Sequence, residues 1–170
     1  MTNFWIEKTY YKHRKADSSR NEGERSVGKA IWSPEFGKDG RDTYKNMRKV
    51  SKGDIILHLV NNTEIIGFSE VSSPKYEIVK GIEGTDWNSD RNYLWSLKSF
   101  NELEEPINVK DFLKNNSKHD ILNEIRELCE VFYTEQFNLR QGAYLTPATF
   151  ELLSFLDIIY QNQLNKNLPF

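Results

Sequence analysis

Two runs of apolar and β-branched residues flank Asn61–Asn62 in the stretch GDIILHLVNNTEIIGFSEV, residues 53–71. A pair of asparagines tolerates the positive φ angles of a tight two-residue turn, and runs of this length on either side are typical of strands. The segment therefore predicts a β-hairpin, so the fold has to contain an antiparallel sheet.

Other patterns predict strands early in the chain and helices late. Residues 3–9 alternate in period two, and residues 93–100 form a further candidate strand. A short helix is expected to begin at Asp42, with Tyr44 and Met47 packed inward, and another is expected over 110–115. Two longer helices are expected, over 120–137 from the spacing of apolar residues and over 148–164 behind a cap at Thr146–Pro147. Together these patterns predict an α+β fold.

Length and composition favour one domain that spans residues 1–170. The chain has 38% hydrophobic and 13% aromatic residues, enough for one core. Its apolar runs are far shorter than the roughly 20 residues that cross a bilayer, and its start does not resemble a signal peptide. A lone cysteine, Cys129, and three scattered histidines predict neither an internal disulfide nor a zinc site. We therefore expect a cytoplasmic protein without metal or cofactor.

Positive charge is concentrated near the start of the chain. Residues 1–52 carry 13 Lys and Arg against 7 Asp and Glu, net +6, whereas residues 53–170 carry 10 against 18, net −8. Basic and aromatic residues alternate over 10–15 and 44–49, as they do on many nucleic-acid-binding surfaces, although a solvated face gives the same pattern. The candidate contacts to a phosphate backbone are Lys12, Arg14, Lys15, Lys38, Arg41, Lys45, Arg48 and Lys49.

Motifs of the common enzyme classes are missing from the sequence. It holds no phosphate-binding loop, no dinucleotide fingerprint, no G-x-S-x-G and no H-E-x-x-H. His58 lies between two leucines in a predicted strand and is expected to be hydrogen-bonded or half exposed, while Cys129 lies in an apolar helical stripe and is expected to be buried. Binding is therefore favoured over catalysis.

Four tryptophans separate into two groups. Trp5 and Trp95 lie inside predicted strands and are expected in the core, but Trp32 and Trp87 lie among polar and turn residues. Two such indoles facing each other across a gap one nucleobase thick would enclose a planar group, and each stacked base is worth about 1 to 3 kcal/mol. The alternative is that each indole caps one end of a small barrel.

The order of several short motifs resembles the YTH and EVE domains of the PUA-like superfamily. These motifs are Lys8–Thr9, Trp32–Ser33, the Lys-Gly-Asp turn at 52–54 and Gly67–Phe68. The resemblance covers about residues 3–110. It implies a small twisted β-barrel over about 1–110, flanked by helices, with a helical part over about 111–165.

A second resemblance lies near the end of the chain. Residues 138–153, NLRQGAYLTPATFELL, are similar to the segment that closes EVE-like domains at the front of McrB-type modification-dependent restriction proteins. This resemblance implies a domain that recognises a modified base in DNA by base flipping. The partners it implies are a GTPase motor and a nuclease that belong to other domains or subunits of an antiphage system.

The resemblance also implies roles for individual residues. Trp32 and Trp87 correspond to the walls of an aromatic cage, and the backbone of Ser33 corresponds to a group that accepts from the exocyclic amine of a base. The rim would consist of Lys8, Thr9 and Tyr10. Where YTH domains carry an asparagine that hydrogen-bonds the base, this chain has His13 and Arg14, so the identity of the base stays open.

Three alternative functions remain from the sequence. The first is a YTH-like reader of modified RNA. The second is a small ribonuclease of the related ASCH type, in which Lys8 and Thr9 would act in the cleft. The third is a protein-interaction module with Trp32 and Trp87 as hydrophobic anchors.

Overall fold

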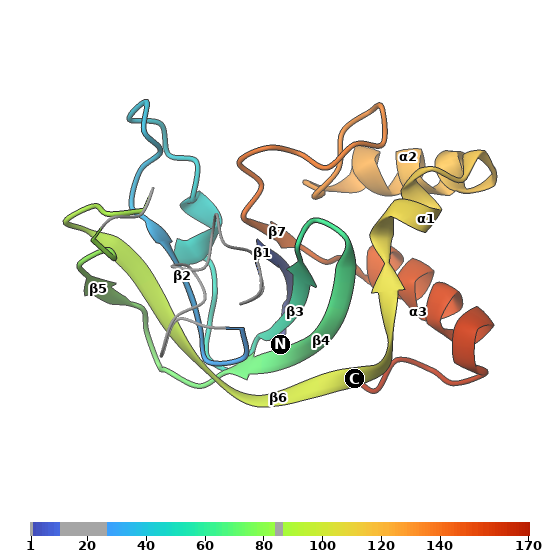
Figure 1. The fold of residues 1–170 in the computed structure, drawn as a ribbon, viewed down its shortest axis with the longest axis horizontal. Coiled ribbons are helices and arrows are strands. Elements are labelled where there is room, and N and C mark those ends of the chain that lie inside the picture. The colour runs from blue at the N-terminus through green and yellow to red at the C-terminus, as the bar shows by residue number, and fades with distance from the viewer. Residues whose placement is uncertain (1, 11–26, 84–86) are drawn as a thin grey trace.

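A computed structural model describes residues 2–10, 27–83 and 87–170, and it shows one strongly curved mixed sheet with helices gathered on one side (Figure 1). The strands are β1 Phe4–Thr9, β2 Ala30–Pro34, β3 Ile55–Val60, β4 Glu64–Val71, β5 Glu77–Val79, β6 Asn92–Asn108 and β7 Leu145–Pro147. The helices are α1 Val109–Leu113, α2 His119–Leu128 and α3 Phe150–Leu164, with 3-10 turns at Lys45–Arg48 and Asn116–Lys118.

The strand order is β2-β6-β4-β3-β1-β7, and β5 pairs with β6 as well. Only β1 and β3 are parallel among these pairs, with Trp5 opposite Ile56 and Glu7 opposite His58. The long strand β6 pairs with β2 and β5 through its first half and with β4 through its second, so it bends the sheet into a half-barrel (Figure 1). The α+β class expected from the sequence is confirmed.

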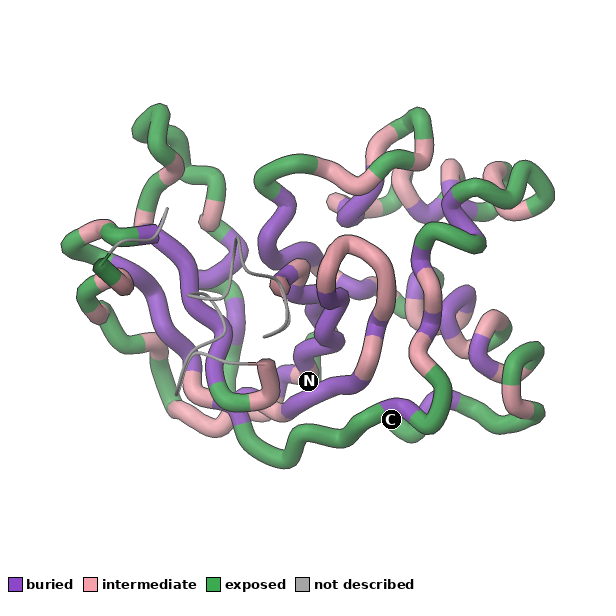
Figure 2. The backbone as a smooth tube through the Cα atoms, viewed as in Figure 1, coloured by how far each residue is buried: buried purple, intermediate pink, exposed green. Residues whose placement is uncertain are grey.

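Both faces of the central strands are covered, which explains why residues 55–60 form an almost continuous apolar run. One face packs against α1, α2 and α3 through a cluster that includes Ile6, Leu57, Leu122 and Phe155. The inner face of the curl holds a second cluster with all four tryptophans. Figure 2 shows the buried positions following β1 to β4 and the inward sides of the helices. Trp5 and Trp95 are therefore core residues, as expected.

The hairpin and the late strand follow the sequence prediction closely. Asn61 and Asn62 adopt φ angles of 54° and 56°, as the predicted tight turn requires, and β3 pairs antiparallel with β4. The strand expected over 93–100 is longer, because β6 continues to Asn108 and the start of α1. The helix expected over 110–115 corresponds to α1.

Three helix predictions need correction. The segment after Asp42 forms only the 3-10 turn Lys45–Arg48, because the Asp42 carboxylate accepts from the Arg48 guanidinium instead of capping a helix. The helix expected over 120–137 ends at Leu128, where Cys129 is extended and only partly buried.

The third correction concerns the cap of the last helix. Thr146 and Pro147 belong to β7 and pair with β1, so the cap of α3 is Thr149, whose side chain accepts from the backbone N–H of Leu152. Both threonines stand just before a run of apolar residues at helical spacing, so either could cap the helix. Only the pairing of Thr146 with β1 shows that Thr149 is the cap.

Candidate functional site

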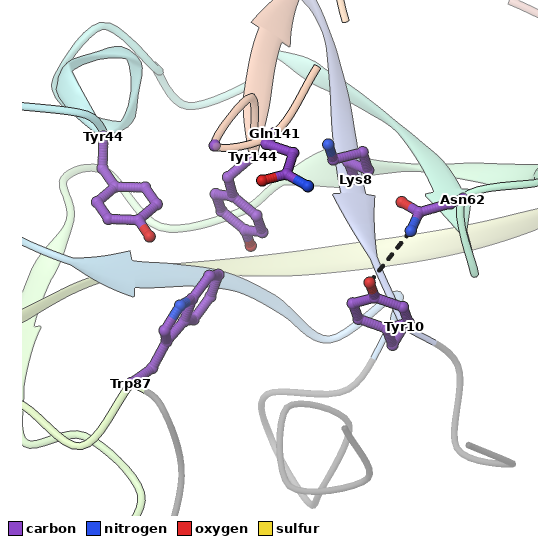
Figure 3. Close-up of a pocket in the computed structure, with 8 residues that line it drawn as sticks. Lys8, Tyr10, Tyr44, Asn62, Trp87, Gln141 and Tyr144 are labelled. Atoms are coloured by element: carbon purple, nitrogen blue, oxygen red, sulfur yellow. Dashed lines mark hydrogen bonds between the residues drawn. The ribbon is translucent and has the colours of Figure 1, made fainter. Parts of the chain in front are cut away.

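A cavity of about 300 Å³ opens at the end of β1, where five separate segments meet (Figure 3). Its lining residues are Lys8, Tyr10, Tyr44, Asn62, Trp87, Gln141, Gly142 and Tyr144. Three of the four aromatic rings form one part of the lining, and the Tyr10 ring lies in the other part with the lysine and amide side chains (Figure 3). A concave site with apolar walls and a few polar groups is typical of ligand binding.

The Trp87 indole is the centre of the aromatic wall. It meets the rings of Trp32, Tyr44 and Tyr144 edge to face, at centroid distances of 5.1, 5.7 and 5.0 Å. The loop that carries it is held by Gly81, whose N–H donates to the carbonyl of Ser89 and whose missing side chain leaves room for the carbonyl of Trp87. Any Cβ at position 81 would lie 2.0 Å from that carbonyl oxygen. Trp87 is therefore held both through its backbone and through its ring contacts.

The expected sandwich of two parallel indoles is wrong in this structure. Trp32 and Trp87 are 84° apart in plane and touch, so no gap one nucleobase thick separates them. Edge-to-face contact is the arrangement that the ring quadrupoles favour. Trp32 is only 2% exposed and supports Trp87 from behind, so it is neither a cage wall nor an exposed hydrophobic anchor. Trp87, 8% exposed, does line the cavity.

The expected role of Ser33 also changes. Backbone hydrogen bonds join Glu35 to Arg91 and Leu97 to Lys29, on either side of the Ser33–Tyr93 pair. Backbone groups alternate in direction along an antiparallel strand, so those of Ser33 point toward β6 and not toward the cavity. Its hydroxyl is buried and donates to the carbonyl of Pro34.

A buried polar network holds the Tyr144 ring. The Tyr144 hydroxyl donates to Glu7 Oε1 at 2.6 Å and accepts from the backbone N–H of Trp32 at 3.0 Å. Glu7 Oε2 lies 2.7 Å from His58 Nδ1, and His58 Nε2 lies 2.9 Å from Ser69 Oγ. His58 is thus a hydrogen-bonded interior residue, one of the two outcomes expected from the sequence. The network fixes both the ring plane and the hydroxyl direction of Tyr144.

Lys8 and Tyr10 lie where the sequence predicted a rim. The Lys8 ammonium donates to the carbonyl of Arg140 and lines the cavity. Burial, helped by the nearby Arg140 charge, lowers the pKa of Lys8 from 10.5 to about 8. Tyr10 accepts at its hydroxyl from the Asn62 amide at 3.1 Å. Thr9 is buried and is not among the cavity-lining residues.

The predicted phosphate-contacting residues have different surroundings. Lys12, Arg14 and Lys15, and the neighbouring His13, lie outside the described residues. Arg41 pairs with Asp39 at 3.1 Å, and Arg48 pairs with Asp42, which lowers the pKa of that carboxyl group. The remaining three, all exposed, are Lys38, Lys45 and Lys49.

Several cavity residues were not predicted as binding residues. Tyr44 was expected only to pack inward, while Asn62, Gln141 and Tyr144 had no assigned role. Gln141 and Tyr144 belong to the segment 138–153, whose resemblance to EVE-like domains was the only sequence signal available. Within the described ranges, no cluster of three or more His, Cys, Asp and Glu could hold a metal ion, and no helix is long and apolar enough to cross a membrane.

Comparison with solved structures identifies the architecture. Human THYN1, solved in complex with 5-methylcytosine-containing DNA, matches 99% of this chain and 100% of its own, with a TM-score of 0.54 and 11% identity. Rpa0253 from Rhodopseudomonas palustris matches 98% of this chain and 97% of its own, with a TM-score of 0.52 and 14% identity. The fold is PUA-like, and the matching structures are PUA-like and EVE-type proteins. The fold expected from the sequence is thereby confirmed.

A further structural match has a lower TM-score. The N-terminal domain of Staphylothermus marinus McrB matches 89% of this chain and 91% of its own, with a TM-score of 0.48 and 16% identity. No protein-family model and no curated protein matches the sequence.

Proposed function

We propose that this chain binds a methylated base of DNA, flipped out of the duplex into the cavity beside Trp87. The observation that carries this proposal is the aromatic cavity at the end of β1, on a fold shared along its whole length with THYN1. THYN1 was solved with 5-methylcytosine-containing DNA, so 5-methylcytosine is the first base to test.

The aromatic wall supplies the energy that base flipping needs. Extruding a nucleotide costs a few kcal/mol of pairing and stacking. Stacking on an aromatic side chain returns about 1 to 3 kcal/mol, and a buried methyl group adds about 0.8 kcal/mol. The cavity offers the rings of Tyr44, Trp87 and Tyr144 for this purpose. The base would lie against the Trp87–Tyr144 wall, and not between Trp32 and Trp87.

The polar part of the cavity would supply the discrimination. One methyl group distinguishes two bases by only about fourfold, because 0.8 kcal/mol is little more than RT. A wrong base that leaves a buried donor or acceptor unpaired loses more, about 1 to 3 kcal/mol for each group. Lys8, Asn62 and Gln141 place an ammonium and two amides around the cavity, and these can read the edge of a base.

Binding to duplexes that carry one modified base tests this function. Trp87→Ala and Gln141→Ala should each reduce the preference for the modified duplex at least fivefold and leave weak, salt-sensitive association. Gln141 is exposed, so its replacement is informative even if Trp87→Ala unfolds. Phe150→Ala, at a ring 79% exposed on α3 outside this cavity, is the matched control. Fluorescence polarisation gives the affinities, and full preference in both cavity variants would contradict the proposal.

The same measurement separates the alternatives that differ in ligand or chemistry. An RNA reader would prefer single-stranded RNA bearing the modified base over the equivalent DNA duplex. An ASCH-like ribonuclease would cleave labelled RNA and would lose that activity on Lys8→Met. Lys8 is the reason to test the nuclease alternative, because it lines the cavity and its pKa is lowered to about 8.

Lys8 should make binding depend on pH. The ammonium form donates hydrogen bonds to a base or phosphate and the amine form carries no charge, so affinity should fall as pH rises through about 8. Because one proton is involved, we expect about a tenfold loss between pH 7 and 9. Lys8→Arg stays charged over this range and should remove the dependence. A wild-type profile that is flat over the range would exclude Lys8 from the contact.

The finer role that the sequence implies is that of a specificity domain in a McrB-like restriction system. Its support is the similarity of residues 138–153 to the closing segment of EVE-like domains in such proteins. In that role a GTPase motor and a nuclease on other domains or subunits would act after the base has been recognised.

A further inference from the structure

A second cavity, of about 740 Å³, adjoins the first at Trp87. The two cavities share Tyr44, Trp87, Gln141 and Gly142, so a ligand in one lies next to a ligand in the other. The second cavity is additionally bordered by Pro34 and the loop after β2, and by Asn88 and Ser89. Its volume is within the range of small-molecule sites.

Phe36 is the unusual residue of this second cavity. Its ring is 52% exposed, although it lies on the short loop directly after β2 and borders a cavity. Exposing a phenyl ring forgoes the stabilisation that its burial would give. Exposed aromatic rings in nucleic-acid-binding proteins serve as stacking platforms, since every base has a π-face.

The surroundings of Phe36 fit a nucleotide better than an apolar ligand. Lys38, two residues further along the loop, lines the same cavity and can meet a phosphate. Asn88 and Ser89 add polar groups to the lining, whereas a site for a lipid or an apolar peptide would be lined mainly by aliphatic side chains. Because both cavities are lined by Trp87, this site adjoins the proposed site of the modified base.

We infer that this second cavity holds the nucleotide next to the modified base in the same DNA strand, with its base stacked on Phe36. The inference rests on the proposed function, because it takes the first cavity as the site of the modified base. It adds a flanking-nucleotide subsite, and it makes binding depend on a base at that neighbouring position. Stacking is tolerant of sequence, so the subsite favours larger purines without demanding one base.

Abasic flanks test the subsite directly. Duplexes would carry one 5-methylcytosine and an abasic residue at its 5′ or its 3′ neighbour. We expect wild-type affinity to fall about tenfold for an abasic residue on one side and to change little on the other. Phe36→Ala should lose the same factor on the intact duplex and become insensitive to the abasic residue, and Phe36→Trp should restore the sensitivity.

The controls separate this inference from the proposed function. Phe36 is half exposed, so Phe36→Ala should keep the wild-type melting temperature, and Phe150→Ala again serves as the matched aromatic control. The ratio of affinities for modified and unmodified duplexes should be unchanged in Phe36→Ala. A normal ratio with full sensitivity to the abasic flank in Phe36→Ala would overturn the subsite and leave the proposed function standing. A wild-type ratio of one would overturn both.

Discussion

Asp54→Ala is expected to lower the free energy of unfolding by about 3 to 5 kcal/mol, as measured by urea denaturation. The Asp54 side chain is buried and accepts four hydrogen bonds from three residues. These come from the Trp5 indole at 2.9 Å, the backbone N–H of Ser51 at 2.9 Å, and the backbone and side chain of Asn3 at 3.0 and 3.2 Å. Removing the carboxylate leaves the buried indole N–H without this acceptor and removes the hydrogen bonds by which Asp54 joins Asn3 and Trp5 to the turn before β3.

Asp54→Asn should recover only part of this loss, because all four partners are donors. The amide offers one oxygen, and its NH₂ group would face donors on the other side whichever way it is turned. We expect a loss of about 2 kcal/mol for Asn, against less than about 0.5 kcal/mol for Asp90→Asn at an exposed site. A double-mutant cycle with Trp5→Phe should give a coupling energy above about 1 kcal/mol. A neutral Asp54→Asn would show that the hydrogen bonds to the replaced oxygen contribute nothing to stability.

Local patterns explain most of what the sequence predicted correctly. The turn at Asn61–Asn62 and the strands beside it depend on residues within one hairpin, so turn chemistry and period two were sufficient. Helix boundaries were less well predicted because partners distant in sequence decide them. Thr146 reads as a helix cap, and it becomes part of a strand only because it lies opposite Ile6.

The candidate site depends almost entirely on such distant partners. Tyr44, Trp87 and Tyr144 come from three separate segments, and only the closure of the sheet brings their rings together. The sequence indicated that Trp32 and Trp87 have unusual surroundings, but the angle between two rings is set by packing in three dimensions. Composition carries no information about it. The polar network behind Tyr144 was equally inaccessible, since it joins residues up to 137 positions apart.

Glu7→Ala should be strongly destabilising inside the curl of the sheet, because it leaves two buried groups without their partner. The Tyr144 hydroxyl and the His58 ring both lose a carboxylate oxygen at hydrogen-bond distance. An unsatisfied buried polar group costs about 1 to 3 kcal/mol, so we expect a loss of about 3 kcal/mol or more in denaturation experiments. The Tyr144 ring would also lose its fixed orientation in the cavity wall.

Glu7→Gln should cost much less, about 1 kcal/mol, because His58 can change tautomer whereas the donors around Asp54 cannot. The glutamine oxygen still accepts from Tyr144, and its NH₂ can donate to His58 Nδ1 once that nitrogen has lost its proton. His58 Nε2 would then donate to the Ser69 hydroxyl. Nitrogen NMR of the His58 ring should show the tautomer exchanged between wild type and Glu7→Gln. If Glu7→Gln is as destabilising as Glu7→Ala, or the tautomer does not change, then His58 does not keep its hydrogen bonds by changing tautomer.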